Sequence, residues 1–160
     1  MPLLLAAYAR YRAGAGPEPL GLELAGSATG RGPGIELEPE PDAARLATMH
    51  AQAAALVHPA RHEGFGLTLL EAMVAGTPVI AVDGSAVREV CGDAAWRLCA
   101  PDAAELAAAM VALAGEPRRR LELARRGQTR AHGFSWARSA RQHVTAYLVA
   151  RSAYSSRRRR

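Results

Sequence analysis

The chain has 160 residues, 49% of them hydrophobic and 5% aromatic, which allows one domain with a core of its own and excludes two full α/β domains. Arg157–Arg160 supply most of the net charge of +5, because the rest of the chain carries 16 basic side chains against 15 acidic ones. A nucleic-acid-binding function would therefore rest on this terminal run alone, and nucleic acid is not an expected partner.

Short apolar runs alternate with longer helical patterns along most of the chain. Helices are predicted over 2–13, 42–54, 67–75 and 85–91, and strands over 20–25, 35–38, 54–59, 78–82 and 94–99. Only helices follow: one is capped by Asp102, one begins at Pro117, and one is capped by Ser135 and reaches about Ser152. This order predicts an α/β fold, a doubly wound parallel sheet with a helical C-terminal tail. We expect one domain over 1–153 and a disordered Arg-rich tail over 154–160.

The sequence offers no pattern for a metal, a cofactor or a membrane. Cys91 and Cys99 form no CxxC motif, and none of the five histidines belongs to a ligand cluster such as HExxH. No apolar run approaches the roughly 20 residues of a membrane span, and the opening residues lack the features of a signal peptide. We therefore expect a cytoplasmic protein that needs no metal and no cofactor.

Residues 62–81, "HEGFGLTLLEAMVAGTPVIA", combine two glutamates with a glycine-flanked helix start. The segment follows a predicted strand, so it lies at the carboxyl edge of the sheet, where such folds bind ligands. The free amides of the helix start suit a diphosphate, and Gly64 and Gly66 let the backbone approach it. The carboxylates of Glu63 and Glu71 each match a pair of sugar hydroxyls. Together these features indicate a nucleotide-sugar with one glutamate on each side of the phosphates.

The same residues also allow a purely structural interpretation. Leu67, Leu70 and Val74 would form an ordinary buried stripe of the helix. A glutamate in the first helical turns is favoured by the helix dipole alone. Residue types and spacing leave both interpretations open.

"EGFGLTLLEAMVAGTPVIA" resembles the signature of the retaining glycosyltransferases of family 4, the "group 1" transferases. That signature has two glutamates separated by seven residues, then small residues before Gly-Thr-Pro. "LLLAAYARYRA", "PDAARLATMHAQAAALVHPARHEGFG", "REVCGDAAWRL" and "FSWARSAR" resemble other landmarks of the family in the same order. The resemblance covers nearly the whole chain before the arginine run.

The resemblance implies a GT-B fold, of which this chain is similar to the C-terminal, donor-binding half. By it, Glu63 contacts the donor sugar as the catalytic-site carboxylate, and Glu71 contacts the nucleotide ribose. The implied donor-binding residues are Gly64, Phe65, Gly66, Leu67, Thr68 and Glu71. The loop over 38–42 would lie near the base. The implied activity is hexosyl transfer with retention from a nucleoside-diphosphate sugar to an acceptor that the sequence does not identify.

Two features depart from the family pattern. The family's C-terminal half begins with a strand and a glycine-rich loop carrying an Arg and a Lys, whereas this sequence begins after that point and contains no lysine. The segment between Gly26 and Ile35 is also too short for the helix that the family has there, so its glycines are interpreted as a shortened loop rather than a phosphate cradle. We therefore expect no catalysis without the missing N-terminal half.

Two other functions remain open beside the transferase. The chain would be a non-catalytic interaction module or relic if it kept the fold without binding nucleotide, and a nucleic-acid binder if the arginine run dominated.

The final helix offers a further choice, because its apolar stripe through Val144, Tyr147 and Leu148 would pack either on the domain's own sheet or on the missing half. In the second case the stripe faces water, and a separate N-terminal half or self-association is expected.

Overall fold

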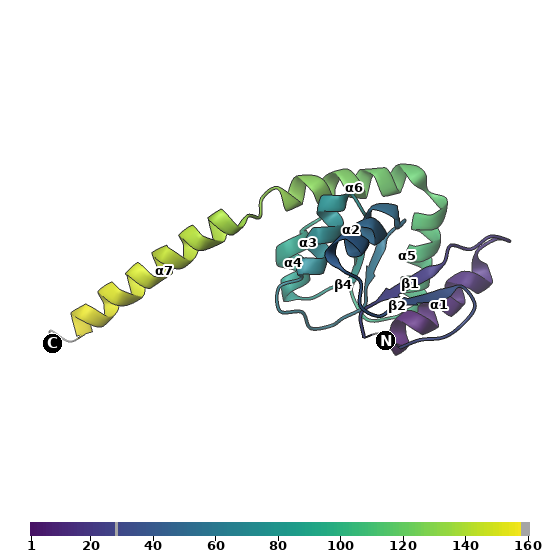
Figure 1. Ribbon diagram of the computed structural model, residues 1–160, viewed down its shortest axis with the longest axis horizontal. Helices are drawn as coiled ribbons and strands as arrows, with labels where there is room; N and C mark the ends of the chain where they lie inside the picture. The colour runs from purple at the N-terminus through teal and green to yellow at the C-terminus, as the bar shows by residue number, and fades with distance from the viewer. Residues whose placement is uncertain (28, 158–160) are drawn as a thin grey trace.

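The computed structural model describes residues 1–27 and 29–157. Figure 1 shows a body of strands and helices from which the C-terminal helix extends. The helices are α1 (Pro2–Gly14), α2 (Ala43–Gln52), α3 (Leu67–Ala75), α4 (Ser85–Cys91), α5 (Ala103–Gly115), α6 (Pro117–Ala131) and α7 (Trp136–Arg157). The strands are β1 (Leu22–Ala25), β2 (Ile35–Glu38), β3 (Leu56–His58), β4 (Val79–Val82) and β5 (Trp96–Leu98). The predicted α/β class and the order of elements are confirmed.

Strand β4 lies at the centre of the core because its side chains alternate between two helical layers. Ile80 and Val82 belong to a buried cluster with residues of α1 and α5, whereas Val79 and Ala81 belong to a second cluster with residues of α3 and α4. This period of two is expected of a strand covered on both faces. Helices therefore cover both sides of the sheet, as predicted.

The strands pair in two groups rather than in one continuous sheet. β1 pairs with β2 in parallel, and β3, β4 and β5 form a separate parallel sheet in that order. Among the described residues, no strand joins β1 to β3. The sequence pattern identified each strand but not this division, because pairing depends on contacts between distant segments.

The segment between β1 and β2 is held by α1. The hydroxyl of Tyr8 lies 2.9 Å from the carbonyl oxygen of Gly34 and 3.1 Å from that of Leu20, and donates to one of them at a time. Gly34 has a φ of +73°, and a Cβ there would lie 2.7 Å from the Tyr8 hydroxyl, so only glycine fits. No helix is present in the described residues of this segment. These contacts support its interpretation as a short structural loop.

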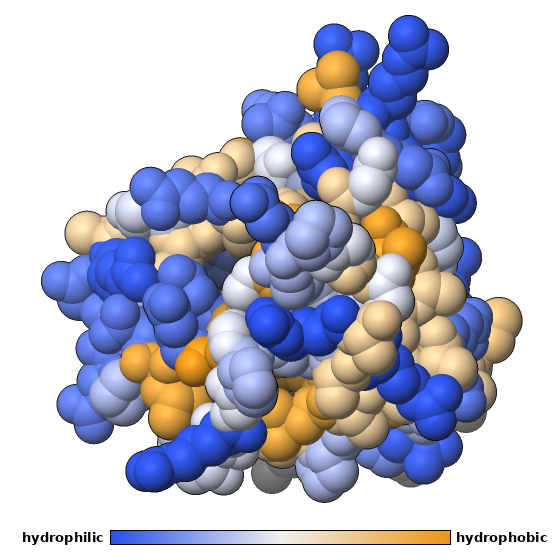
Figure 2. Space-filling model, turned by 90° about the vertical axis from the view of Figure 1, so that its right-hand side faces the viewer, coloured by the Kyte–Doolittle hydropathy of each residue, from blue (hydrophilic) through white to orange (hydrophobic). Residues whose placement is uncertain are grey.

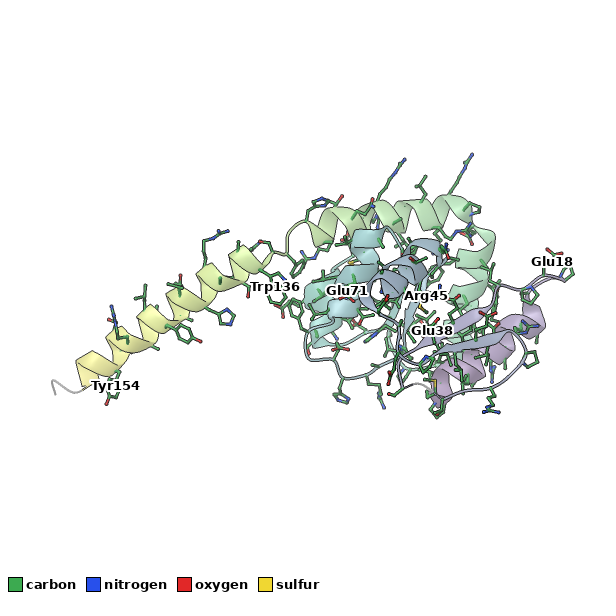
Figure 3. The ribbon with its side chains drawn as sticks, viewed as in Figure 1. Glu18, Glu38, Arg45, Glu71, Trp136 and Tyr154 are labelled. Atoms are coloured by element: carbon green, nitrogen blue, oxygen red, sulfur yellow. The ribbon has the colours of Figure 1, made fainter. Side chains whose placement is uncertain are left out.

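Helix α7 stands clear of the body, and its side chains project into solvent around it (Figures 1 and 3). Val144, Tyr147 and Leu148 are 57%, 71% and 51% exposed. The stripe therefore faces water, and the alternative in which it packs on the domain's own sheet is wrong. The helix continues to Arg157, beyond the predicted end near Ser152. Of the tail predicted over 154–160, residues 154–157 are thus helical, and 158–160 lie outside the described residues.

Local signals set several helix ends. The Asp42 carboxylate accepts a 2.7 Å hydrogen bond from the amide of Arg45, and Asp102 caps α5 in the same way. The Ser135 hydroxyl accepts from the amide of Arg138 at the start of α7. None of the helices in the described part of the chain is long and apolar enough to cross a membrane.

Candidate functional site

The loop over residues 59–66 leads from the carboxyl end of β3 into α3. It ends at Gly66, which has a φ of +94° and precedes the first residue of α3. A Cβ on Gly66 would lie 2.8 Å from the Leu69 side chain, so the local fold itself requires glycine here. At Gly64, by contrast, a Cβ would meet no atom within 4 Å. The backbone of Gly64 therefore borders open space at the edge of the sheet.

The start of α3 carries free hydrogen-bond donors. No side chain among the described residues caps this helix, and its first turn contains no acidic residue. Its first two amides, those of Leu67 and Thr68, precede the first backbone hydrogen bond, which the amide of Leu69 donates to Gly66. The helix start therefore offers donors and a positive dipole end to an anion.

Glu63 is held within the loop by two contacts. One carboxylate oxygen, Oε1, accepts a 3.0 Å hydrogen bond from the amide of Gly64, and the other, Oε2, lies 3.2 Å from Nε2 of His58. The His58 contact is an ion-pair distance without hydrogen-bond alignment. Burial lowers the pKa of His58, and the charge of Glu63 partly opposes this shift. The sequence analysis gave His58 no role beyond excluding it from a metal-ligand cluster, so its contact with Glu63 is a new element of the site.

Glu71 lies one turn into α3 with an exposed side chain. Leu67 and Val74, on the same helix, are 51% and 68% exposed. The predicted buried stripe through Leu67 and Val74 is therefore wrong. The residues that are buried instead are Leu69, Ala72 and Met73.

The reason is that α3 packs against α6 and β4 through its other face. Gly127 of α6 faces Met73 so closely that a Cβ there would lie 3.1 Å from the Met73 side chain. This close approach sets the rotation of α3 about its axis and leaves Glu71 exposed. The purely structural interpretation keeps a buried stripe, but its residues are Leu69, Ala72 and Met73 rather than those predicted.

The charge of Glu71 also acts on a buried histidine of α2, the helix that packs beside α3. His50 is 7% exposed, and its Nε2 atom has no hydrogen-bond partner among the described residues. Burial lowers the pKa of His50, and the charge of Glu71 acts in the opposite direction. The lowered pKa of His50 favours the neutral form of its ring.

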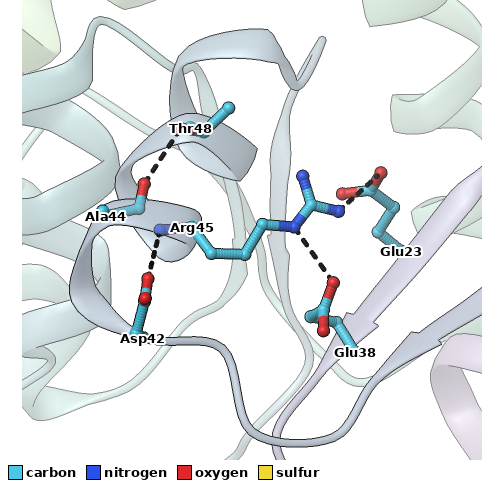
Figure 4. Close-up of polar contacts among 6 residues, drawn as sticks. All are labelled: Glu23, Glu38, Asp42, Ala44, Arg45 and Thr48. Carbon is cyan, nitrogen blue, oxygen red and sulfur yellow. Dashed lines mark hydrogen bonds and ion pairs between the residues drawn. The ribbon is translucent and has the colours of Figure 1, made fainter.

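A second polar group lies at the start of α2, after β2 (Figure 4). Arg45 Nε donates a 3.0 Å hydrogen bond to Glu38, and its Nη2 lies 3.8 Å from Glu23. The hydrogen bond to Glu38 is the main cause that raises the pKa of Arg45. These contacts hold the loop over 38–42, predicted to lie near the base, against α2. Sequence spacing gave no sign of this group, because its members come from three separate elements.

The remaining predicted residues differ in their surroundings. Phe65 is 43% exposed and meets Phe134 edge to face, with ring centroids 6.1 Å apart. Within residues 1–27 and 29–157, no three His, Cys, Asp or Glu side chains are grouped as metal ligands. The predicted site thus consists of loop amides, a helix start and two carboxylates, one of them paired with a histidine.

A sequence model of the family "Glycosyl transferases group 1" matches residues 13–130. The fold and this match define an α/β domain of the glycosyltransferase class. The chain therefore belongs to the group 1 glycosyltransferase family, as the resemblance predicted.

Named relatives agree with this assignment. The chain is 39% identical over 106 residues to the MMP alpha-(1->4)-mannosyltransferase of Mycolicibacterium hassiacum, a match covering 64% of this chain and 26% of the relative. It is 33% identical over 101 residues to the O-antigen chain mannosyltransferase B of Escherichia coli, covering 63% and 26% respectively. It is 36% identical over 109 residues to the D-inositol 3-phosphate glycosyltransferase of Frankia alni, covering 67% and 27%.

A solved structure shows the same fold. Sucrose-phosphate synthase from Thermosynechococcus elongatus superposes with a TM-score of 0.78 and 25% identity, covering 94% of this chain and 42% of that enzyme. The chain spans about a quarter of the length of the relatives it matches in sequence. Its size and fold correspond to the C-terminal half of a GT-B glycosyltransferase.

Proposed function

We propose that this chain binds a nucleoside-diphosphate sugar and serves as the donor domain of a retaining glycosyltransferase. The observation that carries the proposal is the helix start at Gly66. It offers free amides at the carboxyl edge of β3, with the carboxylate of Glu63 before it and the exposed carboxylate of Glu71 one turn after it. Such a start binds phosphate, and carboxylates accept hydrogen bonds from sugar hydroxyls.

The two glutamates have different roles in this proposal. Glu63, held by His58 and by its own loop, faces the donor sugar and stabilises it as the nucleoside diphosphate departs. Glu71 binds the ribose, and the amides from Gly64 to Thr68 hold the sugar and diphosphate. The loop over 38–42, fixed by Arg45, lies near the base.

Catalysis by this chain alone is not part of the proposal. The sequence contains no lysine, so no lysine of this chain would neutralise the charge of a departing diphosphate. The match to this chain covers about a quarter of each relative's length. The residues that bind the acceptor are therefore expected from a part of the transferase outside the matched domain. We infer that transfer needs a polypeptide that completes the cleft.

Nucleotide titration followed by NMR tests the donor role. Two of the relatives are named mannosyltransferases, so GDP and GDP-mannose are the first ligands to test, with UDP and ADP in parallel. Binding should shift the amide signals of residues 64–68 and of Glu71 while leaving those of α7 unchanged. If none of these nucleotides binds at about 1 mM, equivalent to roughly −4 kcal/mol, the chain is better described as a non-catalytic interaction module.

A further inference from the structure

The chain contains two phenylalanines, Phe65 and Phe134, and their rings contact each other. Phe65 lies in the donor loop, residues 59–66, and Phe134 lies in the short connection between α6 and α7. The rings meet edge to face, with centroids 6.1 Å apart and planes at 76°, which is a geometry that aromatic pairs prefer. We propose that Phe134 is a positioning residue, which acts through Phe65 to hold the donor loop ready for a nucleotide-sugar. The proposal rests on the donor role proposed above.

The backbone of the donor loop does not by itself fix the position of Phe65. Gly64 and Gly66 flank this residue, and glycine adopts more backbone conformations than other residues do. The Phe65 side chain is 43% exposed, so it is not fixed by full burial in the core. The contact with Phe134 therefore supplies a restraint that the two glycines cannot.

Phe134 is itself held by hydrogen bonds at the end of α6. Its amide donates to the carbonyl oxygen of Ala131 at 3.0 Å, and the amide of Gly133 donates to that of Arg130 at 3.0 Å. The carbonyl oxygen of Gly133 accepts a further hydrogen bond, at 3.0 Å, from Nη1 of Arg138 in α7. The Phe134 side chain is half-buried. Contacts with both neighbouring helices thus fix the backbone that carries this ring.

Arg130 of α6 connects the Phe134 ring to α4. Its guanidinium carbon lies 5.1 Å from the centroid of the ring, which is within the range of a cation–π contact. Its Nε donates a 2.9 Å hydrogen bond to the carbonyl oxygen of Val90, and its Nη2 donates to that of Glu89. Both carbonyls belong to the last turn of α4, where arginine side chains commonly bind the final carbonyl groups of a helix.

The start of α4 approaches another part of the donor loop. Gly84 directly precedes α4, and a Cβ at this position would lie 3.3 Å from the carbonyl oxygen of Arg61. The loop is therefore contacted at two points, through its backbone by Gly84 and through a side chain by Phe134. Arg130 links the two contacts, since it binds α4 and lies against the Phe134 ring.

Replacing the Phe134 ring should weaken nucleotide binding without unfolding the domain. A loop that is ordered before binding spends less free energy on ordering when the ligand arrives. Phe134→Leu keeps an apolar side chain but removes the aromatic contact, and the energy of such a pair corresponds to about a 2- to 10-fold loss of affinity. Phe134→Tyr keeps the ring and should retain the affinity of the wild type.

Fluorine NMR of the free protein tests the contact, because labelling with 4-fluorophenylalanine gives one signal for each of the two rings. The signal that remains in Phe134→Leu belongs to Phe65. We expect it to move and to narrow relative to the wild type, because the ring loses a neighbour and turns more freely. Phe134→Tyr should restore its position. A Phe65 signal with the position and width of the wild type in Phe134→Leu would overturn the proposal.

A second aromatic pair reports whether the variants are folded. Tyr8 and Tyr11 of α1 stack with centroids 5.9 Å apart. α1 lies at the end of the body turned away from α7 (Figure 1), and Figure 2 shows the face at that end, where hydrophilic and hydrophobic side chains mix. The proton signals of these tyrosines should be the same in the wild type and in Phe134→Leu, which separates a local effect from unfolding.

An arginine variant decides the question if Phe134→Leu does not fold. Arg130→Gln removes the cation above the Phe134 ring and should shift both fluorine signals. Arg126→Gln is the matched control on the same helix, because it removes a surface ion pair with Glu122 and should shift neither signal. Equal spectra for Arg130→Gln and the wild type would overturn the proposal.

Titration with GDP, UDP and ADP distinguishes this proposal from the donor role itself. We expect Phe134→Leu to bind about 2- to 10-fold more weakly than the wild type, and Phe134→Tyr and Arg126→Gln to bind as the wild type does. Equal affinities for the wild type and Phe134→Leu would overturn the positioning role and leave the donor role intact. Binding of none of the three nucleotides to the wild type would overturn the donor role, and with it the function assigned here to the ring contact.

Discussion

His58, the last residue of β3, places its Nε2 atom 3.2 Å from the carboxylate of Glu63 in the loop that follows. The strand therefore fixes the position of the predicted catalytic-site carboxylate through a side chain as well as through the backbone. His58 is partly buried and Glu63 is exposed, so the pair links the edge of the core to the surface where the donor is proposed to bind. The arrangement makes Glu63 a positioned group rather than a freely rotating one.

Removing the Glu71 carboxylate should weaken nucleotide binding without unfolding the domain. A hydrogen bond to a charged group is worth about 1.5 to 3 kcal/mol, so Glu71→Ala should reduce affinity for the nucleoside diphosphate roughly 10- to 100-fold. The side chain is exposed, which limits the effect on stability. Titration calorimetry measures the change, with Glu89→Ala on the surface of α4 as the matched control. Equal affinities for wild type and Glu71→Ala would exclude the ribose role.

The purified chain should release no nucleoside diphosphate from a nucleotide-sugar, although it should bind one. It has no lysine to stabilise the departing diphosphate, and the proposed donor role leaves the acceptor to another part of the transferase. A coupled assay for nucleoside diphosphate measures this directly. Steady release that is abolished by Glu63→Ala and retained by Glu89→Ala would show that the chain is catalytic by itself.

The boundaries of α3 could be predicted from the sequence because glycine marks both ends. The predicted range of 67–75 agrees with the structure, where Gly66 and Gly76 both adopt a positive φ. This signal is local, since only glycine adopts such a conformation at little cost. The fold class followed in the same way from the order of short apolar runs and helical patterns.

The buried face of α3 could not be predicted because it depends on another part of the chain. Gly127, more than 50 residues after Met73, lets α6 approach and sets the rotation of the helix. The division of the sheet and the grouping of Arg45 with Glu38 and Glu23 are also tertiary features. His58 and Glu63 are only five residues apart in the sequence. Their contact could still not be predicted, because the sequence does not show that the His58 side chain is partly buried beside the loop.

Acid should destabilise the domain through His50, which is buried, and His58, which is partly buried. Burial lowers the pKa values of His50 and His58 below the ordinary 6.5, although the charges of Glu71 and Glu63 oppose the shift. Below about pH 6.5 the unfolded chain therefore binds more protons than the folded chain. The stability contributed by the neutral rings is complete above that pH and is lost as the pH falls through the folded pKa values.

Thermal unfolding between pH 5 and pH 8 measures this dependence. The melting temperature of the wild type should fall as the pH is lowered. A plot of melting temperature against pH should be flatter for the variant that combines His50→Asn and His58→Asn, whatever the absolute stability of that variant. His143→Asn on α7 is the control and should keep the slope of the wild type. An unchanged slope in the double variant would assign the pH dependence to other groups.

The exposed stripe of α7 should make the chain self-associate or fray at this helix. Tyr147 and Leu148 are 71% and 51% exposed, so their hydrocarbon faces water at a cost of roughly 25 cal/mol per Å² relative to burial. Patches of this kind mark a partner surface or an aggregation hazard. Tyr147→Ser combined with Leu148→Ser should therefore improve solubility at little cost in stability. Light scattering and thermal unfolding test both parts: a monomeric wild type together with a strongly destabilised double variant would mean that α7 packs against the domain in solution.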